Sequence, residues 1–423
     1  MEEKKKNNKI ILAVIGIIMI LGIIGGVTYA YFSAQASTET QTITTAKLDI
    51  GFTNGDIIRA IDIEPIDDVD IKTKATELPF TITNNGNKDM KADIKLTNIE
   101  IDEELKNVNF RWGLFNEDTG LAVSRGTFTY IEESPYIIRD AVIDAKEAKN
   151  YILRVWIHNN GLLQNEMQEK VFSAKVDVTA QILEYTDESC FITYGMGDIQ
   201  GYDDNCPKDV VIPKSLDGKT VTKIGPFFQN KGLTSVIIPD TVTNLSGTFS
   251  GNNLTYITIP ESITSLDSSP FVNNNISNIY MHDNISSLEH HFSNNNLKSI
   301  VLPENITYFG CGAISDNPLT ELILNTKLNG ISEYMICSNS SPFANNKIKE
   351  IEIPNNINVI GATAFINSPD LQKIIVRGKN GIEDFKTDFS QDSCDSGSYP
   401  NPSVCTKAPG LTSLNDVEII FVP

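Results

Sequence analysis

The sequence NNNLKSIVLPENI, at residues 294–306, is one of a series of similar segments that decides how a large part of this chain folds. The copies share an asparagine, an aliphatic residue, a pair of alternating aliphatic residues and, in most copies, a proline. The proline position recurs at Pro213, Pro239, Pro260, His282, Pro303, Asn325, Pro354 and Arg377. The steps are 26, 21, 22, 21, 22, 29 and 23 residues, so the period is near 22 with two insertions.

A second series of residues tests this register. Large apolar residues stand at Phe228, Phe249, Phe271, Phe292, Ile314, Phe343 and Phe365, in steps of 21, 22, 21, 22, 29 and 22. Both series contain the same long step, which places one insertion between Asn325 and Phe343. A period in this range is typical of leucine-rich repeats, whose single units cannot bury their apolar face and stack to form a common core. The sequence therefore predicts a repeat solenoid over residues 210–385.

The quoted unit has the pattern of a strand followed by a turn. Ile300 and Leu302 are two residues apart and should share the interior face of a strand, while Val301 points outward. Pro303 should end the strand because proline has no N–H to donate to a neighbouring strand. The asparagines suit tight turns because asparagine tolerates the left-handed backbone conformation. The repeated segment is therefore interpreted as a structural unit.

The composition indicates a folded chain with a strong negative charge. Its 423 residues are 40% hydrophobic and 21% charged, which is enough apolar material for two or three domains and too much for general disorder. The formal net charge is -20. Because nucleic acid attracts basic surfaces, this charge argues against a nucleic-acid partner.

The first 30 residues have the pattern of a signal peptide or a membrane anchor. A basic start, MEEKKKNNK, precedes an uncharged stretch from Ile10 to Phe32, which is long enough to span a bilayer. Small residues allow cleavage after Ala30 or, alternatively, after Ala36. In either case the rest of the chain is expected outside the cell. Contact with the membrane is expected only through this N-terminal helix.

All six cysteines lie late in the chain, at Cys190, Cys206, Cys311, Cys337, Cys394 and Cys405. An even number in an exported chain favours disulfides. The spacings favour sequential pairs, Cys190 with Cys206 before the repeats and Cys394 with Cys405 near their end. Cys311 and Cys337 fall in neighbouring units, which stack about 5 Å apart and so within disulfide reach. A zinc site is the alternative, but the sequence contains no C-x-x-C pair.

Residues 31–186 contain longer runs of alternating apolar residues. The segment PFTITNNGNKDMKADIKL (79–96) predicts two strands joined as a hairpin at Asn85-Gly86. Similar alternation occurs in YILRVWIH (151–158) and KVFSAKVDVTAQIL (170–183). Several such strands separated by turn residues predict an antiparallel, jelly-roll-like β-sandwich. Together with the repeats, this makes the chain mainly β.

The segment GGVTYAYFSAQASTETQTITTAKLDIGF (25–52) resembles the export signal and first strand of the TasA/camelysin group of Gram-positive surface and biofilm-matrix proteins. In that group a SipW-type signal peptidase cuts after the small residue of a G-G-x-T-aromatic-Ala motif, which matches residues 25–30 here. The resemblance extends more weakly to the TNNGNKDMKADIKL segment. It implies cleavage after Ala30, with a peptidase of this type as the processing partner.

The array from CPKDVVIP (206–213) onward resembles the BspA-type leucine-rich repeats, or LRR_5 repeats, of bacterial surface proteins. The segments DGKTVTKIGPFF and NNINVIGATAF match that group's I-G-x-x-A-F return. This array departs in being rich in asparagine and in replacing proline by His282 and Asn325. The expected divisions are 1–30 signal or anchor, 31–186 sandwich, 187–209 disulfide-closed cap, 210–385 repeats and 386–423 C-terminal cap with a local disulfide.

No catalytic constellation is present in the sequence. Camelysin relatives are described as metallopeptidases, yet none of the four histidines belongs to an H-E-x-x-H motif. They are His158, His282, His290 and His291. The adjacent pair His290-His291 is either a transition-metal site or, as we expect, a solvated turn. There is also no G-x-S-x-G motif. We therefore expect no enzymatic activity, no cofactor and no resident metal.

Calcium is the one ion that the sequence leaves open. Two acidic segments, residues 66–70 and 201–205, offer clustered oxygen ligands, although neither has EF-hand spacing. Trp112 and Trp156 are expected to pack in or on the sandwich rather than to stack on sugars.

Two functions fit these expectations. In the first, outward side chains of successive strands form a face for adhesion to an extracellular protein or glycan. These side chains are Thr258, Tyr280, Val301, Ile323 and Glu352. In the alternative, the chain is a structural subunit of a biofilm-matrix fibre, and the strand at residues 42–50 completes the sheet of a neighbouring copy instead of pairing within its own domain. Both place the protein in the extracellular space or on the surface of a Gram-positive bacterium.

Overall fold

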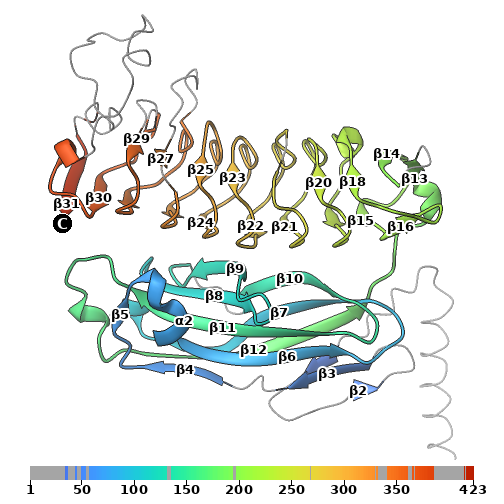
Figure 1. Ribbon diagram of the computed structural model, residues 1–423, viewed down its shortest axis with the longest axis horizontal. Helices are drawn as coiled ribbons and strands as arrows, with labels where there is room; N and C mark the ends of the chain where they lie inside the picture. The colour runs from blue at the N-terminus through green and yellow to red at the C-terminus, as the bar shows by residue number, and fades with distance from the viewer. Residues whose placement is uncertain are drawn as a thin grey trace, which may run out of the picture.

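The structure, a computed structural model, describes residues 34–36, 43–44, 49–53, 57–130, 135–193, 197–266, 268–328, 330–331, 341–360, 364–365, 367–384, 414 and 416–423. Two bodies lie side by side along their length (Figure 1). We call residues 34–182 the two-sheet region and residues 209–422 the repeat array. The prediction of a mainly β chain is confirmed.

The expected apolar helix at residues 1–30 and the cleavage residue Ala30 lie outside the described residues. The alternative cleavage residue, Ala36, ends a short strand. Within the described ranges, none of the helices has the length and apolar character needed to cross a membrane.

The two-sheet region contains two mainly antiparallel sheets around a shared apolar core. The first sheet has the order β1 (Ala34–Ala36), β12 (Val171–Ile182), β7 (Met90–Ile101) and β10 (Tyr136–Ile143), and β4 (Ile57–Ile61) also pairs with β12. The second has the order β2 (Ile43–Thr44), β3 (Asp49–Thr53), β6 (Thr76–Asn84), β11 (Ala148–His158), β8 (Phe110–Asn116) and β9 (Ala122–Thr127), and β5 (Pro65–Ile66) pairs in parallel with β11. The short helices are η1 (Asp68–Asp70), α2 (Ile71–Lys74), η2 (Glu103–Leu105) and η3 (Asn165–Met167).

The alternation seen in the sequence produces the core of this region. Ala92, Ile94 and Leu96 of β7 are fully buried, and Ile94 lies opposite the buried Val178 of β12. The predicted hairpin between β6 and β7 is wrong, because these consecutive strands belong to different sheets. Alternation identifies the buried face of each strand but not the sheet that the strand joins.

The N-terminal strand pairs within its own chain. Ile43 of β2 lies opposite Ile50 of β3, and β3 in turn pairs with β6. The described parts of the segment at residues 42–50 therefore form a hairpin at one edge of the second sheet.

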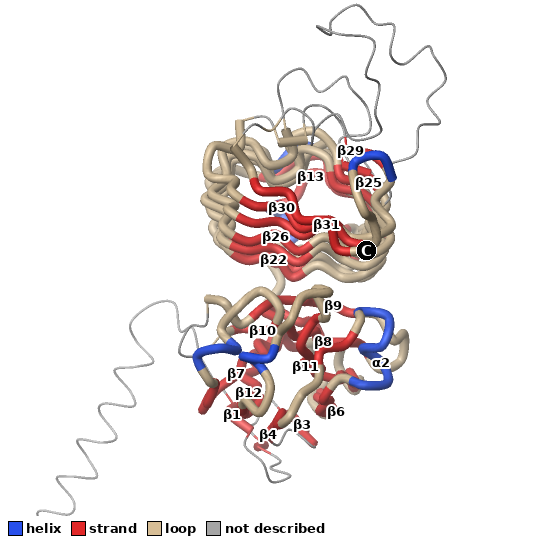
Figure 2. The backbone as a smooth tube through the Cα atoms, turned by 90° about the vertical axis from the view of Figure 1, so that its left-hand side faces the viewer, coloured by secondary structure: helices blue, strands red, loops and turns tan. Residues whose placement is uncertain are grey.

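The repeat array is a stack of units whose equivalent strands run parallel along two sides (Figure 2). The side next to the two-sheet region carries β15 (Asp209–Val211), β19 (Ser235–Ile237), β21 (Tyr256–Thr258), β22 (Asn278–Tyr280), β24 (Ser299–Val301), β26 (Glu321–Ile323), β28 (Glu350–Ile353), β30 (Lys373–Arg377) and β31 (Glu418–Val422). The return side carries β14 (Ile199–Tyr202), β18 (Lys223–Ile224), β20 (Asn244–Leu245), β23 (Ser287–Leu288), β25 (Tyr308–Phe309), β27 (Gly330–Ile331) and β29 (Val359–Ile360). The remaining elements are β13 (Phe191–Thr193), β16 (Ser215–Leu216), β17 (Lys219–Thr220), η4 (Glu188–Cys190), η5 (Pro226–Phe228) and η6 (Ile382–Asp384).

Aromatic rings stack through the interior of the array. The ring centroids of Phe249 and Phe271 are 6.0 Å apart, and those of Phe271 and Phe292 are 5.5 Å apart. Ile314 follows in the next unit and is also fully buried. The series with a period near 22 therefore forms the apolar column of the core.

A second interior column consists of buried asparagines that tie each unit to its neighbour. In the unit that contains Asn295, its Nδ2 donates to the carbonyl oxygens of Phe271 (3.0 Å) and Phe292 (3.1 Å), and its Oδ1 accepts from the N–H of Ile276 (3.0 Å). The equivalent residues are Asn252, Asn274, Asn317 and Asn346. The turn role expected for asparagine belongs to the residue before it, Asn294, whose φ of 54° is left-handed.

The two departures from proline also connect neighbouring units. The Nε2 atom of His282 lies 2.8 Å from the carbonyl oxygen of Pro260, one unit earlier. The side chain of Asn325 donates to the carbonyl oxygen of Pro303, again one unit earlier. Each polar replacement therefore makes a hydrogen bond between units that proline cannot make.

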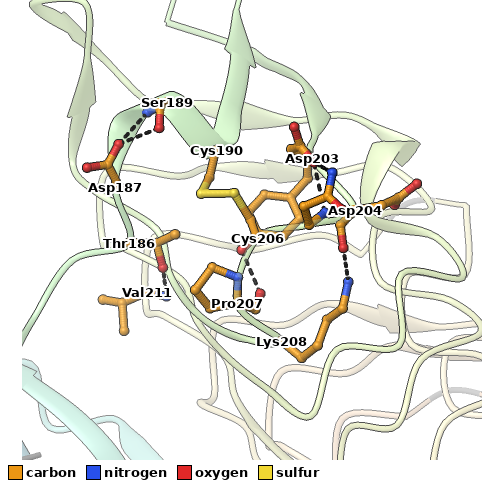
Figure 3. Close-up of a disulfide and its surroundings, with 12 residues drawn as sticks. Thr186, Asp187, Ser189, Cys190, Asp203, Asp204, Cys206, Pro207, Lys208 and Val211 are labelled. Carbon is orange, nitrogen blue, oxygen red and sulfur yellow. Dashed lines mark hydrogen bonds between the residues drawn. A yellow bond between two sulfur atoms is a disulfide. The ribbon is translucent and has the colours of Figure 1, made fainter. Parts of the chain in front are cut away.

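The first end of the array is closed by the predicted disulfide between Cys190 and Cys206, whose Cα atoms are 5.9 Å apart (Figure 3). Next to it, the N–H of Val211 in β15 donates to Oγ1 of Thr186 (2.9 Å), so the incoming chain covers the outer edge of β15. Cys311 is also disulfide-bonded. The other three cysteines, Cys337, Cys394 and Cys405, lie outside the described residues.

Candidate functional site at the contact of the two bodies

The five side chains expected to form an open binding face point outward from the array, in register. Thr258 lies beside Tyr280, and Val301 lies beside Ile323, in adjacent parallel strands. We call these four residues, together with Glu352, the strand face. It is turned toward the two-sheet region, and β9 and β10 pack against β21, β22 and β24 (Figure 1).

The strand face is not freely exposed in this structure, so its role as a binding face stays a prediction. Only 4% of the surface of Tyr280 and 9% of that of Ile323 remain exposed. Tyr280 packs into the apolar core of the two-sheet region. The strand face is thus covered by another part of the same chain.

The centre of this contact is a buried ion pair. Arg125 of β9 donates to both carboxylate oxygens of Asp283 in the array, at 2.9 and 3.2 Å, and its Nη1 lies 3.5 Å from Glu304. The Asp283 carboxylate also accepts from the N–H of Ala122 (2.9 Å). Burial raises the pKa of Asp283, but the Arg125 charge and hydrogen bonds outweigh it and hold the pKa below its usual value.

Toward the first end of the array, the contact is made by hydrogen bonds and a cation–π contact. Oγ1 of Thr258 donates to the carbonyl oxygen of Arg139 (2.6 Å), and the Arg139 guanidinium lies 3.8 Å from the ring centroid of Tyr256. The Tyr256 hydroxyl donates to Asp140. These contacts join β10 to β21.

Toward the other end, the two bodies separate enough to leave a cleft of about 840 Å³. It is lined by η1, β8 and the end of β11 on one side and by β26, β28 and β30 on the other. Ile323 and Glu352 of the strand face line this cleft. It is the part of the strand face that a ligand can approach.

His158 bridges the two bodies at the cleft wall. Its Nδ1 lies 3.0 Å from Asp68 in the two-sheet region, and its Nε2 lies 3.1 Å from Glu352 in the array. Arg111 binds the other oxygen of Asp68 at 3.1 Å, and Arg377 lies 3.7 Å from Glu352.

This network sets the charge state of its members. Burial and the Arg111 charge lower the pKa of His158, but Asp68 and Glu352 outweigh them and raise it above the ordinary value. Burial alone would raise the pKa of Asp68, yet Arg111 and His158 hold it well below its usual range. Burial also opposes ionisation of Glu352, whose pKa is nevertheless lowered by His158. The arrangement is therefore an imidazolium between two carboxylates.

Glu321 is a buried acid on the array side of the cleft. Only 3% of its surface is exposed, and its polar neighbours are the side chains of Thr127 and Thr129. Burial raises its pKa, against the smaller influence of Thr127 and Thr129 in the facing β9 segment and of the Arg111 charge.

The metal-ligand candidates of the sequence are used by the protein itself. In the segment 66–70, Asp68 binds Arg111 and His158, and Asp70 pairs with Lys74 at 2.7 Å. In the segment 201–205, Asp204 pairs with Lys231 at 2.6 Å. Across the described ranges, no group of three or more histidine, cysteine or acidic side chains is placed to hold a metal ion.

Two further sequence expectations concern aromatic residues. Instead of lying in a solvated turn, His291 is 4% exposed, and its Nδ1 accepts from the N–H of Glu289 at 2.9 Å. Trp156 is 2% exposed and packs with Ile66 and Phe115, and Trp112 packs against the core of the two-sheet region. The expectation that the tryptophans pack in or on this region is confirmed.

The residues that join the two bodies were not found from the sequence, although one signal was present. Acidic residues follow the proline position in four successive units, at Asp240, Glu261, Asp283 and Glu304. Glu261 accepts from Asn116 of the two-sheet region at 3.1 Å, and Asp283 and Glu304 share Arg125. A charged residue that recurs with the repeat marks a face with a constant partner or solvent environment.

Comparisons with known proteins agree with this architecture. A family model described as the BspA type leucine rich repeat region, in six copies, matches residues 222–342 and 334–393. A model described as the camelysin metallo-endopeptidase matches residues 4–112, a range that contains no histidine. No curated protein matches the chain. The histidine-free range offers no H-E-x-x-H motif, and the described residues offer no ligand cluster, for a zinc peptidase centre.

The chain thus joins a camelysin-type, TasA-like N-terminal region to BspA-type leucine-rich repeats.

Proposed function

We propose that this protein is a non-enzymatic adhesion protein of a Gram-positive cell surface or extracellular matrix, exported by its N-terminal segment and cut by a SipW-type peptidase. Its ligand, an extracellular protein or glycan, binds the repeat solenoid at the cleft next to Ile323 and Glu352. The sandwich at residues 31–186 and the solenoid at residues 210–385, flanked by the caps at 187–209 and 386–423, are the two working domains.

One observation carries this proposal. The outward face of the repeats is covered over most of its length, but the cleft of about 840 Å³ leaves its last strands accessible. Clefts of this size are typical of ligand sites, and they occur preferentially between domains. The cleft combines apolar strand residues with ionised groups whose charges are already paired, which suits binding rather than catalysis.

The test uses the exported chain, residues 31–423, on arrays of extracellular proteins and glycans. A Thr326→Trp variant fills the cleft, which Thr326 lines, and a Thr264→Trp variant places the same ring on the exposed return side. Binding should be lost in the first variant and kept in the second. Binding that survives Thr326→Trp would exclude the cleft, and casein cleavage that chelators abolish would overturn the non-enzymatic assignment.

The second candidate function is a structural subunit of a matrix fibre. Its support is the open edge at β4, where Ile57 is 58% and Ile61 47% exposed. Exposed apolar edge strands are templates for pairing with another chain. Electron microscopy of residues 31–423 should then show filaments, and removal of residues 31–48 should abolish them. Discrete particles in both samples would leave adhesion as the function.

A further inference from the structure

Three ionisable side chains lie where the two-sheet region meets the array and are each affected by closure of that contact. They are His158 in β11, Glu321 in β26 and Glu304, which follows β24. Each faces charged or polar groups of the opposite body. The ionisation of these three side chains determines how stable the contact over the strand face is. This question is separate from the identity of any ligand.

The geometry of His158 favours a proton on both ring nitrogens. Each nitrogen lies within hydrogen-bond distance of a carboxylate oxygen, Nδ1 of Asp68 at 3.0 Å and Nε2 of Glu352 at 3.1 Å. A neutral imidazole has one N–H and one lone pair, so one of these contacts would become a repulsion. The other charges facing the site are Arg111, behind Asp68, and Arg377, behind Glu352. Only Glu352 and Arg377 belong to the array.

Glu321 opposes closure when it is ionised. It faces Thr127 and Thr129 of the two-sheet region, and Arg111 is the one cation among the groups that influence it. The two threonine side chains offset only part of the cost of burying this carboxylate, because they are neutral donors. A buried carboxylate that lacks an adjacent cation favours its neutral form, or a state in which water reaches it.

Glu304 adds a second acid of the same kind. Its carboxylate lies 3.5 Å from Arg125, but that guanidinium is already bound in two places by Asp283. Two acids therefore share one cation. Lys327 and the more distant Asp68 are the other charges that influence Glu304.

We propose that the contact between the two-sheet region and the repeat array is a clasp that closes in mild acid and opens as the pH rises, with His158 as the closing cation and Glu321 and Glu304 as buried acids whose ionisation weakens closure. Opening uncovers Tyr280, Val301 and Ile323.

The three groups act in the same direction. Closure raises the pKa of His158, so its contribution is present below the ordinary histidine pKa and is lost as the pH rises through the raised value. Closure also raises the pKa of Glu321 and of Glu304 through burial, so ionisation with rising pH weakens closure as well. The facing acids Asp68 and Glu352 have lowered pKa values and remain ionised across this range.

The test measures access to a covered position. Cysteine is placed at the covered Tyr280 in one variant and at the exposed Thr264 in another, and each reacts with an uncharged thiol reagent at about pH 5.5 and about pH 8.5, on either side of the histidine range. The reaction rate of the unsubstituted protein is subtracted from each rate. The rate at the covered cysteine is then divided by the rate at the exposed cysteine, so that the ionisation common to both thiols cancels. We expect this ratio to rise with pH, by about tenfold for each unit of pKa difference between closed and open states.

Two further substitutions, each combined with the cysteine variants, distinguish opening of the clasp from a general loss of structure at higher pH. In His158→Gln the ratio should already be high at the lower pH, and in Glu321→Gln it should rise less at the higher pH. Small-angle scattering of the unsubstituted protein should show a larger radius of gyration at the higher pH. The proposal would be overturned by a ratio that does not change with pH, or by the same pH-dependent rise of the ratio in a variant that combines His158→Gln and Glu321→Gln. If His158→Gln does not fold, as judged by circular dichroism, the Glu321→Gln result decides alone.

Discussion

The interior of the repeat array and its contact with the two-sheet region are built on different principles. Inside the array, each unit repeats the same contacts, as in the ring of Phe271 and the amide of Asn295. At the contact, each unit meets a different partner, since Glu261 meets Asn116 whereas Asp283 meets Arg125. Repetition lets one pattern specify many contacts, whereas a contact between two unlike bodies must be specified residue by residue.

The largest effect should come from the apolar column. Phe271→Ala removes a fully buried ring between Phe249 and Phe292 and should lower the free energy of unfolding by about 3–5 kcal/mol. Chemical denaturation followed by circular dichroism measures this loss, with Thr264→Ala in the same unit as an exposed control. A loss no larger than that of the control would mean that the column does not hold the units together.

The next effect concerns the ion pair at the contact. Arg125→Ala leaves the buried Asp283 without its cation, which costs about 3–5 kcal/mol if the contact stays closed. Because the two bodies can separate and let water reach Asp283, we expect a smaller loss of global stability than for Phe271→Ala. The radius of gyration should increase instead.

A variant without either charge of the pair tests whether the unpaired Asp283 causes the increase in the radius of gyration. The double variant Arg125→Leu/Asp283→Asn removes both charges and should restore the compact form that Arg125→Ala loses. If scattering shows the same compact particle for Arg125→Ala and for the unsubstituted protein, the ion pair does not hold the bodies together.

The asparagine column should show an intermediate effect that depends on position. Asn295→Ala leaves two carbonyl oxygens and one N–H without the partners they have now, at a cost of about 1–3 kcal/mol. Asn296→Ala, at the exposed neighbouring position, should change the unfolding free energy little. Equal losses in denaturation would show that the asparagines act through turn propensity and not through contacts between units.

The smallest effect is expected at His282, whose pKa is lowered, whereas that of His158 is raised. Burial lowers the pKa of His282 in the array, against the hydrogen bond that the ring donates to the Pro260 carbonyl oxygen, so its contribution to stability is present above the ordinary histidine pKa and is lost as the pH falls. His282→Asn, which copies Asn325 at the equivalent position, should make the melting temperature less sensitive to acid. An unchanged acid dependence in thermal melts would assign that loss of stability to other groups.

The sequence alone predicted the period of the repeat array and several strands of the two-sheet region. The period near 22 located Phe271 and Ile314 in the core, because stacking an identical unit forces equivalent residues into one column. The alternation in β7 and β12 identified their buried faces for the same reason, since side chains on a strand have a period of two. The spacing of Cys190 and Cys206 likewise predicted the disulfide at the first end of the array.

Only the tertiary structure decided what covers the strand face. No local pattern states that β6 and β7 enter different sheets, or that β9 comes to lie against β22 and β24. Tyr280 was predicted to point outward from the array, and it does, but into the core of the two-sheet region. The bridge from His158 to Glu352 joins residues 194 positions apart. Local periodicity determines which side of a strand is apolar, whereas the docking of two bodies depends on the shapes and charges of both surfaces at once.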